Sequence, residues 1–222
     1  MTEPYYRDEF VTLYLGDCLE ITEWLAADVL VTDPPYGIGW PTGRLHRYRA
    51  MRDAATPCIV GDESVAVRDA ALNMWNGPSV VFGSWRKPPT GRVPDHRLIW
   101  YKAGRYPGVS PHPWYSAEEE IWLFGTGWVG SPTPTVLMTS ERRSNEPARI
   151  GHPTPKPVSL MSTLIAKCPP GAVADPFVGS GSTLVAAKAL GRKAIGVELE
   201  ERYCEIAARR LAQDVLDFGT SA

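Results

Sequence analysis

Four consecutive residues, Asp33-Pro34-Pro35-Tyr36, carry the groups in this sequence whose types and spacing most clearly suggest chemistry. They follow the apolar stretch 29–31. Because the two prolines fix φ and remove two backbone donors, the segment cannot continue a sheet ladder. It keeps a carboxylate, two free carbonyl groups and an aromatic ring close together. Such a set suits binding of a planar group that bears an NH2, although a proline-stiffened turn is the alternative for so short a motif.

A second chemistry-bearing group lies in the C-terminal third of the chain. It comprises Asp175, Phe177, Gly179, Ser180, Gly181, Ser182 and Thr183. Glycines between a strand and a helix let the backbone turn tightly and approach a ligand at the helix N-terminus. The next predicted strand leads to Glu198, and an acidic residue about 20 positions after such a turn can bind ribose hydroxyls. The turn is not a Walker loop, and Leu184 replaces the third glycine of GxGxxG, which weakens an NAD site.

The hydrophobic pattern predicts the elements that position both groups. Strands are expected at 10–15, 29–32, 79–82, 97–101, 120–124, 172–175 and 193–197, and helices at 21–27, 63–76, 158–167, 182–190 and 201–216. Strands that alternate with helices indicate an α/β fold with a mostly parallel sheet. Ligands of such sheets bind beyond the carboxyl ends of the strands, so the strands ending at Asp33 and Asp175 are expected to be neighbours.

Bulk properties restrict the class of protein. A chain of 222 residues with 44% apolar residues suits one domain with a sizeable core. The sequence contains no run of about 18 apolar residues, so it predicts no membrane span. The polar, acidic start lacks the layout of a signal peptide. The four scattered cysteines favour reduced thiols in a cytoplasmic protein and argue against a structural zinc site, so no metal is expected.

Charge is distributed unevenly along the chain. Residues 1–36 hold one Lys or Arg and eight Asp or Glu, a balance of −7, whereas residues 37–156 hold fifteen against ten, a balance of +5. Residues 157–222 hold seven of each. The basic middle predicts a surface that faces phosphates, and on charge alone a solvated loop face is an equal alternative.

Together with the segment HPTPKP at 152–157 and the ending GVELEERYCEIAARR, these motifs resemble S-adenosylmethionine-dependent DNA methyltransferases that modify an exocyclic amino group. Asp33 precedes Asp175 by 142 positions (175 minus 33), which resembles the permuted β arrangement of that family, with the catalytic half first. The resemblance covers nearly the whole chain. It implies a Rossmann-like fold, a seven-stranded sheet with helices on both faces, and one catalytic domain over residues 1–222.

The resemblance implies that S-adenosylmethionine is the cofactor. Phe177, Gly179 and Gly181 would line its methionine part, and Glu198 would bind its ribose hydroxyls. Asp17 would reach the cofactor's adenine amine, with a simple turn aspartate as the alternative. The other expected cofactor-site residues are Thr154, Lys156, Asp175, Ser180, Ser182 and Thr183, of which Thr154 and Lys156 would contact the cofactor carboxylate or a nearby strand end.

In the same resemblance, residues 33–36 (the DPPY segment) are catalytic. Asp33 would accept one hydrogen of the target amine, and the Pro34 carbonyl would accept the other. Methyl transfer is then an in-line displacement that depends mainly on positioning. Tyr36 would stack on a base that has left the duplex, because the enzyme cannot reach it inside.

Double-stranded DNA is the expected partner. A flexible loop at 38–60, with Arg44, Arg47 and Arg49, and a short target-recognition insertion at 125–151, with Arg142 and Arg143, are the expected contacts. So short an insertion suggests a brief recognition sequence or help from a partner subunit, as in a homodimer.

The DPPY form of the motif favours N6 of adenine as the target, as in restriction-modification methyltransferases, with N4 of cytosine as the alternative. RNA and protein methyltransferases of similar families favour Asn at the position of Asp33, so the aspartate argues against these two classes. A catalytically silent DNA- or cofactor-binding regulator is the non-enzymatic alternative, and no motif residue has been lost that would favour it. A Rossmann oxidoreductase has no use for the DPPY segment.

Overall fold

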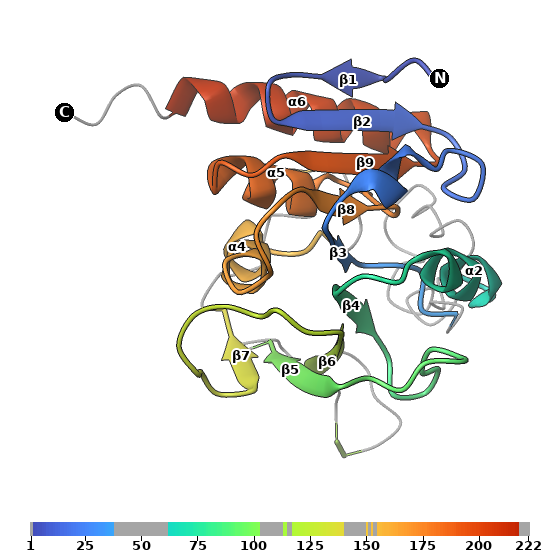
Figure 1. Ribbon diagram of the computed structural model, residues 1–222, viewed down its shortest axis with the longest axis vertical. Helices are drawn as coiled ribbons and strands as arrows, with labels where there is room; N and C mark the ends of the chain where they lie inside the picture. Colours follow the sequence, from blue (N-terminus) through green and yellow to red (C-terminus); the bar gives the residue numbers. More distant parts are fainter. Residues whose placement is uncertain are drawn as a thin grey trace.

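A computed structural model describes residues 2–37, 62–102, 113–114, 117–139, 150, 152 and 155–217, without the side chains of 214–217. Within these ranges one sheet of nine strands organises the molecule (Figure 1). The strands are β1 (Tyr6–Arg7), β2 (Val11–Leu15), β3 (Val29–Thr32), β4 (Ser79–Gly83), β5 (His96–Tyr101), β6 (Glu118–Phe124), β7 (Val136–Met138), β8 (Val173–Asp175) and β9 (Ala194–Glu198). They lie in the order β1-β2-β9-β8-β3-β4-β6-β5-β7.

Helices cover both faces of the sheet, as expected from the sequence. They are a 3-10 turn η1 (Glu23–Ala26) and the α-helices α2 (Ala66–Met74), α4 (Val158–Ile165), α5 (Ser182–Ala189) and α6 (Glu201–Asp217). One core contains buried residues of α4, α5 and α6, and the other contains those of η1 and α2. None of the helices in these ranges is long and apolar enough to cross a membrane.

The five strands from β2 to β4 in the sheet order run parallel, which confirms the predicted parallel centre. In β3, Val29 and Val31 enter one core and Leu30 enters the other, and all three are 0% exposed. A strand buried on both faces reads as a continuous apolar run, which is why its sequence shows no polar alternation.

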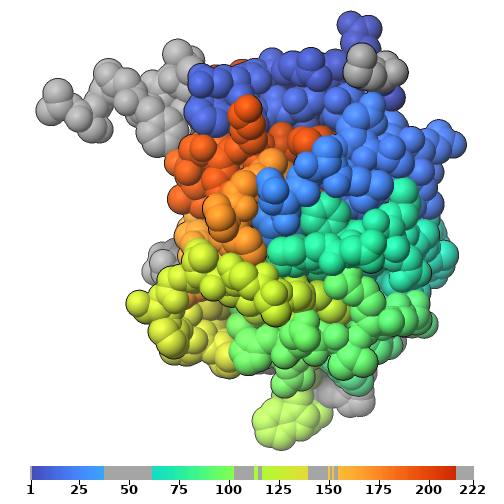
Figure 2. Space-filling model, in the orientation of Figure 1, coloured from blue at the N-terminus to red at the C-terminus, as the bar shows by residue number. Residues whose placement is uncertain are grey.

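Strands β3 and β8 are direct neighbours, as predicted from the positions of Asp33 and Asp175. Leu30 pairs with Ala174, although 144 positions separate them in the chain (174 minus 30). In the space-filling view, early residues (blue) and late residues (orange) meet at the centre of the visible face (Figure 2). The two halves of the predicted site therefore share one edge of the sheet.

The expected number of seven strands was too low, because both edge strands were missed. Strand β1 has only two residues and β7 only three, so neither is long enough to show a hydrophobic period. Strand β7 pairs in parallel with β5 and lies within residues 125–151, the predicted target-recognition insertion, where no strand was expected. The tertiary pairing, rather than the local pattern, makes these residues strands.

Gly196 on β9 allows the turn after β8 and helix α5 to approach the sheet. A Cβ added there would lie 2.4 Å from Val178 Cγ2 and 2.9 Å from Leu184 Cδ1. We therefore expect Gly196→Ala to lower the free energy of unfolding by about 1–3 kcal/mol, since overpacking a tight core strains side chains. Urea denaturation monitored by tryptophan fluorescence measures the change.

Ser79→Ala is the matched control at a buried strand position. The Ser79 hydroxyl is buried and has no hydrogen-bond partner within the described parts of the chain. Removing it should leave stability unchanged or raise it slightly, since an unpaired buried hydroxyl costs free energy. Equal stability of the Gly196→Ala variant and the wild type would contradict the packing account.

Candidate active site

A cleft at the carboxyl edge of the parallel strands contains residues from both ends of the chain. Most of the predicted site residues line it: Asp17, Asp33, Pro34, Pro35, Tyr36, Lys156, Asp175, Phe177, Gly179, Ser180, Ser182, Thr183 and Glu198. Gly181 does not line the cleft. The structure therefore brings the DPPY segment and the glycine turn at 176–181 into one site, as the sequence predicted.

Asp175 connects the two halves of the site. Its Oδ1 accepts a hydrogen bond from Thr32 Oγ1 at 2.7 Å and another from the Phe177 amide at 3.1 Å. Thr32 directly precedes Asp33, so this carboxyl group fixes the end of β3 against the start of the glycine turn. Burial raises the pKa of Asp175 to about 7, although hydrogen bonds from Thr183, Thr32 and Phe177 oppose the rise.

The two glycines of the turn are required by its backbone and its packing. Gly179 has φ 52° and Gly181 has φ 84°, conformations that residues with a Cβ rarely adopt. A Cβ on Gly179 would lie 3.1 Å from His152 Nε2, and one on Gly181 would lie 2.9 Å from Ala207 Cβ in α6. Gly179 thus keeps the cleft wall free of a side chain, and Gly181 lets α5 begin against α6.

Arg210 of α6 supports the turn from behind and was not predicted from the sequence. Its Nη1 donates to the Ser180 carbonyl at 2.6 Å and lies 3.2 Å from the hydroxyls of Ser180 and Ser182. These hydroxyls therefore belong to the frame of the turn as well as to the lining of the cleft.

Glu198 lies at the end of β9, where the ribose-binding carboxylate was predicted. Its Oε2 accepts from the Gly179 amide at 2.7 Å, and its Oε1 accepts from the Glu200 amide at 2.8 Å. Burial raises the pKa of this carboxyl group. Each oxygen has a further lone pair, so the fixed carboxylate can still accept a hydroxyl, and the ribose contact stays a prediction.

Asp17 forms the simple turn that was the alternative to a cofactor contact. Its Oδ1 accepts from the Leu19 amide at 2.8 Å, and its carbonyl accepts from the Ile21 amide at 2.8 Å. Asp17 also lines the cleft. The turn and the predicted contact with an adenine amine are compatible, and the contact stays a prediction.

His152 lies in the cleft as a neutral imidazole. Its ring packs at an angle against Tyr203, with the ring centroids 4.7 Å apart. Burial, followed by the charge of Lys156, lowers the pKa of His152 to about 4. The residue begins the HPTPKP segment, and the sequence predicted no role for it.

Two carboxylates fix the DPPY segment: that of Asp33, which belongs to the segment, and that of Asp62, which lies outside it. The Tyr36 hydroxyl donates to Asp33 Oδ1 at 2.7 Å, so the ring and the carboxylate have fixed positions relative to each other. Asp62 Oδ1 accepts from the amides of Tyr36 at 2.8 Å and Gly37 at 3.0 Å. Asp62 is 6% exposed and was not predicted from the sequence. It gives partners to backbone groups that no strand can satisfy here.

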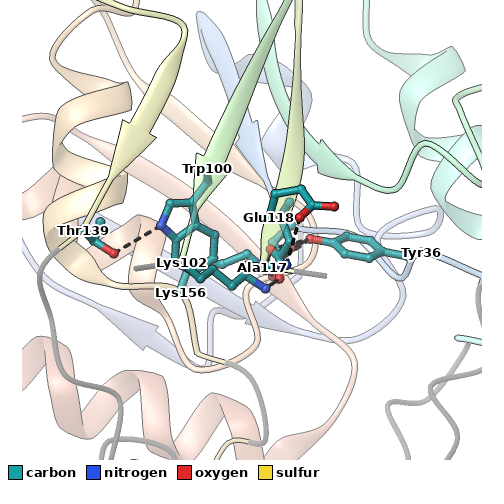
Figure 3. A network of polar contacts seen from close by, with 9 residues as sticks. Tyr36, Trp100, Lys102, Ala117, Glu118, Thr139 and Lys156 are labelled. Atoms are coloured by element: carbon teal, nitrogen blue, oxygen red, sulfur yellow. Dashed lines mark hydrogen bonds and ion pairs between the residues drawn. The ribbon is translucent and has the colours of Figure 1, made fainter. Parts of the chain in front are cut away.

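Asp33 also bonds a lysine, and the contacts continue into the sheet. Lys156 Nζ bonds Asp33 Oδ2 and lies 3.2 Å from Glu119 Oε2, and Lys102 Nζ bonds Glu119 Oε1. We call Asp33, Lys102, Glu119 and Lys156 the buried charge cluster. Figure 3 shows Lys102 and Lys156 extending toward the hydroxyl end of Tyr36.

The cluster shifts the ionisation of its members in consistent directions. Burial alone would raise the pKa of Glu119, but the ammonium groups of Lys156 and Lys102 lower it to about 2. Burial alone would lower the pKa of Lys156, but Asp33 and Glu119 raise it. Burial and these carboxylates raise the pKa of Tyr36 well above its usual value. At neutral pH the lysine is charged and the tyrosine is neutral.

A family model described as DNA methylase (N6_N4_Mtase) matches residues 72–209, which is more than half of the chain. The chain belongs to this DNA methylase family. Among curated proteins, the methylase is 26% identical over 260 aligned positions to the Type II methyltransferase M.ScaI of Streptomyces caespitosus, with 94% of this chain and 84% of M.ScaI covered. It is 29% identical to the putative methylase YubD of Escherichia coli K12, with 89% and 88% covered.

Solved structures share the fold of the methylase. The M1.HpyAVI–SAM complex aligns with TM-score 0.62 and 22% identity over 90% of this chain and 100% of that one. The cytosine-N4-specific PvuII DNA methyltransferase aligns with TM-score 0.65 and 20% identity over 99% and 91%. TTHA0409 of Thermus thermophilus, complexed with S-adenosyl-L-methionine, aligns with TM-score 0.52 and 25% identity over 95% and 99%.

Several predicted site residues of the methylase lie outside the residues that the structure describes. They are Thr154 of the cofactor site, Arg44, Arg47 and Arg49 of the loop at 38–60, and Arg142 and Arg143 of the insertion at 125–151. Part of that insertion is described and contains β7. The DNA contacts assigned to these arginines stay predictions.

The sequence carried a weak signal for the residues that were missed in the charge cluster. Strand β6 begins with three glutamates, and a charge inside a strand that is central to the sheet needs a partner. The partner, Lys102, follows the end of β5. The antiparallel pairing of β5 with β6 brings these groups together, and its register is not recorded in the local sequence.

The buried carboxyl group of Asp175 predicts a dependence of stability on pH. An unfolded Asp has a pKa near 3.9, and the folded group has a pKa of about 7. Between these values the unfolded chain has released its proton and the folded protein has not, so the carboxyl group destabilises the fold increasingly as pH rises to about 7. Asp175→Asn has no such group and should gain stability relative to wild type between pH 4 and 7.

Urea denaturation of wild type and Asp175→Asn at pH 4, 7 and 8 measures this difference without cofactor. The stability difference should change steeply between pH 4 and 7 and only slightly from pH 7 to 8, where the folded carboxyl group completes its ionisation. A gap independent of pH would show that Asp175 ionises in the folded protein as it does in the unfolded chain.

Proposed function

We propose that this methylase transfers a methyl group from S-adenosylmethionine to the exocyclic N6 amine of adenine in double-stranded DNA. One observation carries the proposal: the DPPY carboxylate and the glycine turn lie in one cleft and are tied together through Thr32 and Asp175. A methyl donor bound at the turn would lie beside the group that binds the amine. The family supports DNA as the substrate.

The cofactor assignment is supported by the shape of the turn and by a relative. TTHA0409, at 25% identity over 95% of this chain, is described as a complex with S-adenosyl-L-methionine. In this chain, the bare Cα of Gly179 and the fixed carboxylate of Glu198 face the same cleft, which suits a ribose with its attached chain. When bound, the cofactor supplies a methyl group on a positively charged sulfur. Phe177 and Asp17 would complete its site.

The protein's own groups act on the target amine. The lone pair of such an amine is delocalised into the ring, so the nitrogen must be rotated or pyramidalised before it attacks. Asp33 accepts one hydrogen and the Pro34 carbonyl accepts the other, which orients the nitrogen in line with the methyl. The Tyr36 hydroxyl fixes the Asp33 carboxylate at 2.7 Å while its ring offers a face for stacking on the extruded base.

The choice of adenine rests on the DPPY form of the motif. Cytosine N4 is the alternative within the same family, and the cytosine-specific PvuII enzyme at 20% identity supports a common fold only. Both amines have the same chemistry, so the identity of the methylated nucleoside distinguishes them.

Asp33→Ala should abolish turnover while cofactor binding survives. Asp33 orients the amine and accepts its proton, so its loss should lower the rate of methyl transfer by about 10²–10⁴-fold or more. The measurement is transfer of labelled methyl from S-adenosylmethionine to unmethylated DNA, with cofactor affinity determined by calorimetry. Glu205→Ala removes an exposed carboxylate of α6 that pairs with Arg209, and it should behave as wild type. Near-normal turnover of Asp33→Ala would show that Asp33 does not bind the amine.

Nucleoside analysis of the labelled product completes the test. N6-methyldeoxyadenosine is expected. N4-methyldeoxycytidine would move the target to cytosine and leave the mechanism intact. No incorporation into any DNA, together with tight cofactor binding, would favour a silent regulator.

A further inference from the structure

Lys156 has two carboxylate partners in the buried charge cluster, and one of them is the proposed amine-binding group. Its ammonium bonds Asp33 Oδ2 and lies 3.2 Å from Glu119 Oε2. The Tyr36 hydroxyl donates to the other oxygen of Asp33 at 2.7 Å. Both oxygens of Asp33 are therefore engaged before any target base enters.

This arrangement conflicts with the reaction as proposed. During methyl transfer the bond from sulfur to the methyl carbon breaks and its electron pair stays on sulfur, while a bond from the amine nitrogen to that carbon forms. The nitrogen is then positive until it releases a proton to Asp33. An ammonium held against Asp33 cancels the field of the carboxylate where that positive charge develops. Lys156 cannot take the proton, because Asp33 and Glu119 keep it charged.

We propose that Glu119 is a positioning residue that receives the Lys156 ammonium when the target amine approaches Asp33. The inference rests on the proposed function, in which Asp33 binds that amine. Lys156 Nζ already lies 3.2 Å from Glu119 Oε2, so a small rotation of one side chain transfers it. The Tyr36 hydroxyl lies 3.2 Å from the same oxygen and can keep its bond to Asp33.

Lys102 holds the receiving carboxylate in place. It bonds Glu119 Oε1, is 7% exposed, and lies 4.9 Å from the centre of the Trp100 ring. Trp100 is fully buried, and its Nε1 donates to Thr139 Oγ1 at 3.2 Å, as Figure 3 shows. The fixed side of the cluster is therefore anchored in the sheet, and movement is confined to Lys156.

The charges of the cluster predict what the loss of Glu119 does. Two carboxylates and two ammonium groups sum to zero. Glu119→Gln keeps the size of the side chain but leaves the cluster, Asp33 included, with a net charge of +1, and it removes the second carboxylate partner of Lys156. The ammonium then stays on Asp33, and the transition state with its positive nitrogen is disfavoured.

The first test compares two adjacent glutamates of β6. Glu119→Gln should lower kcat for methyl transfer by about 10²-fold, comparable with the loss of one preorganised electrostatic group, while cofactor affinity is unchanged. Glu120→Gln is the matched control, because Glu120 is 7% exposed and pairs with Arg97 instead of the cleft lysines. It should keep its turnover. Wild-type turnover of Glu119→Gln would overturn the proposal.

A double variant separates positioning from a structural role. Glu119→Gln with Lys156→Met restores a net charge of zero and frees Asp33, so its kcat should exceed that of Glu119→Gln alone. A merely structural Glu119 predicts that the double variant is no faster, and that result would overturn the proposal. If Glu119→Gln does not bind cofactor, Glu119→Asp replaces it in the same comparison, alone and combined with Lys156→Met. The shorter side chain of Glu119→Asp moves the carboxylate away from Lys156.

The outcomes for Asp33 and Glu119 are distinguishable. Near-normal turnover by Asp33→Ala would contradict the proposed function itself. An inactive Asp33→Ala variant together with a fully active Glu119→Gln variant would contradict only the role proposed for Glu119.

A different observation concerns the turn at 84–88, which follows β4. Trp85 is 66% exposed, and the Arg86 guanidinium lies 5.4 Å from the centre of its ring. Arg86 and Lys87 are exposed as well. Residues 84–92 contain three Lys or Arg and no Asp or Glu, so this part of the basic middle is positive. An exposed ring beside cations has the chemistry that binds nucleic acid.

A buried arginine holds the backbone of the turn through two hydrogen bonds. Arg68 is 1% exposed and donates to the carbonyls of Lys87 at 2.7 Å and Pro88 at 3.1 Å. Its own partner is Asp69, at 2.7 Å. A surface fixed in advance loses little conformational entropy when it binds. Since β4 lies parallel to β3, the turn leaves the same edge of the sheet as Asp33.

We infer that the turn at 84–88 binds DNA next to the target base, with Arg86 and Lys87 on phosphates and Trp85 against an unstacked base. This surface is independent of the loop and insertion predicted from the sequence. It would add contacts from a fixed part of the fold to the side of the cleft that receives the base.

Fluorescence anisotropy with a labelled, unmethylated DNA duplex tests this surface. Arg86→Ala with Lys87→Ala should reduce the slope of log affinity against log salt by about 1.8, since each phosphate contact contributes about 0.9. Trp85→Ala should weaken binding by about tenfold. Arg209→Ala, which removes an exposed cation of α6, should change neither. Unchanged affinity and salt slope in both turn variants would overturn the inference.

Discussion

The adjacency of β3 and β8 is the constraint on which the rest of this structure depends. The parallel pairing brings the strand that ends before Asp33 beside the strand that ends at Asp175. The hydrogen bond from Thr32 Oγ1 to Asp175 Oδ1, at 2.7 Å, then fixes the two ends against each other. The turn with its positive φ angles, its support by Arg210 and the orientation of the DPPY segment all start from this junction. Two motifs that are remote in sequence become one cleft because of it.

Much of this arrangement could be predicted from sequence, because the decisive elements are locally encoded. The apolar run of β3, the glycines after β8 and the two prolines after Asp33 each constrain their own backbone. The edge strands β1 and β7 could not be predicted, since their few residues form strands only through pairing. Asp62, Glu119 and Lys102 escaped for a related reason: their roles depend on contacts between segments, which no local pattern records.

The buried charge cluster shows why such residues matter. Ionised groups in a dry site are costly unless they are paired, and here four of them form contacts that leave no net charge. Replacing the set with apolar residues would in general cost the fold little. A functional reason therefore accounts better for retaining it, and the position of Asp33 at its exposed end supplies that reason.

The order of strands in the sheet also has a consequence for how the chain folds during synthesis. Strands β2 and β3 are made early, yet β9 and β8 lie between them in the finished sheet. The centre of the sheet cannot close until residues 173–198 have left the ribosome. Early strands rich in Val and Leu must wait with unpaired edges, a situation that favours slow folding and association with other chains.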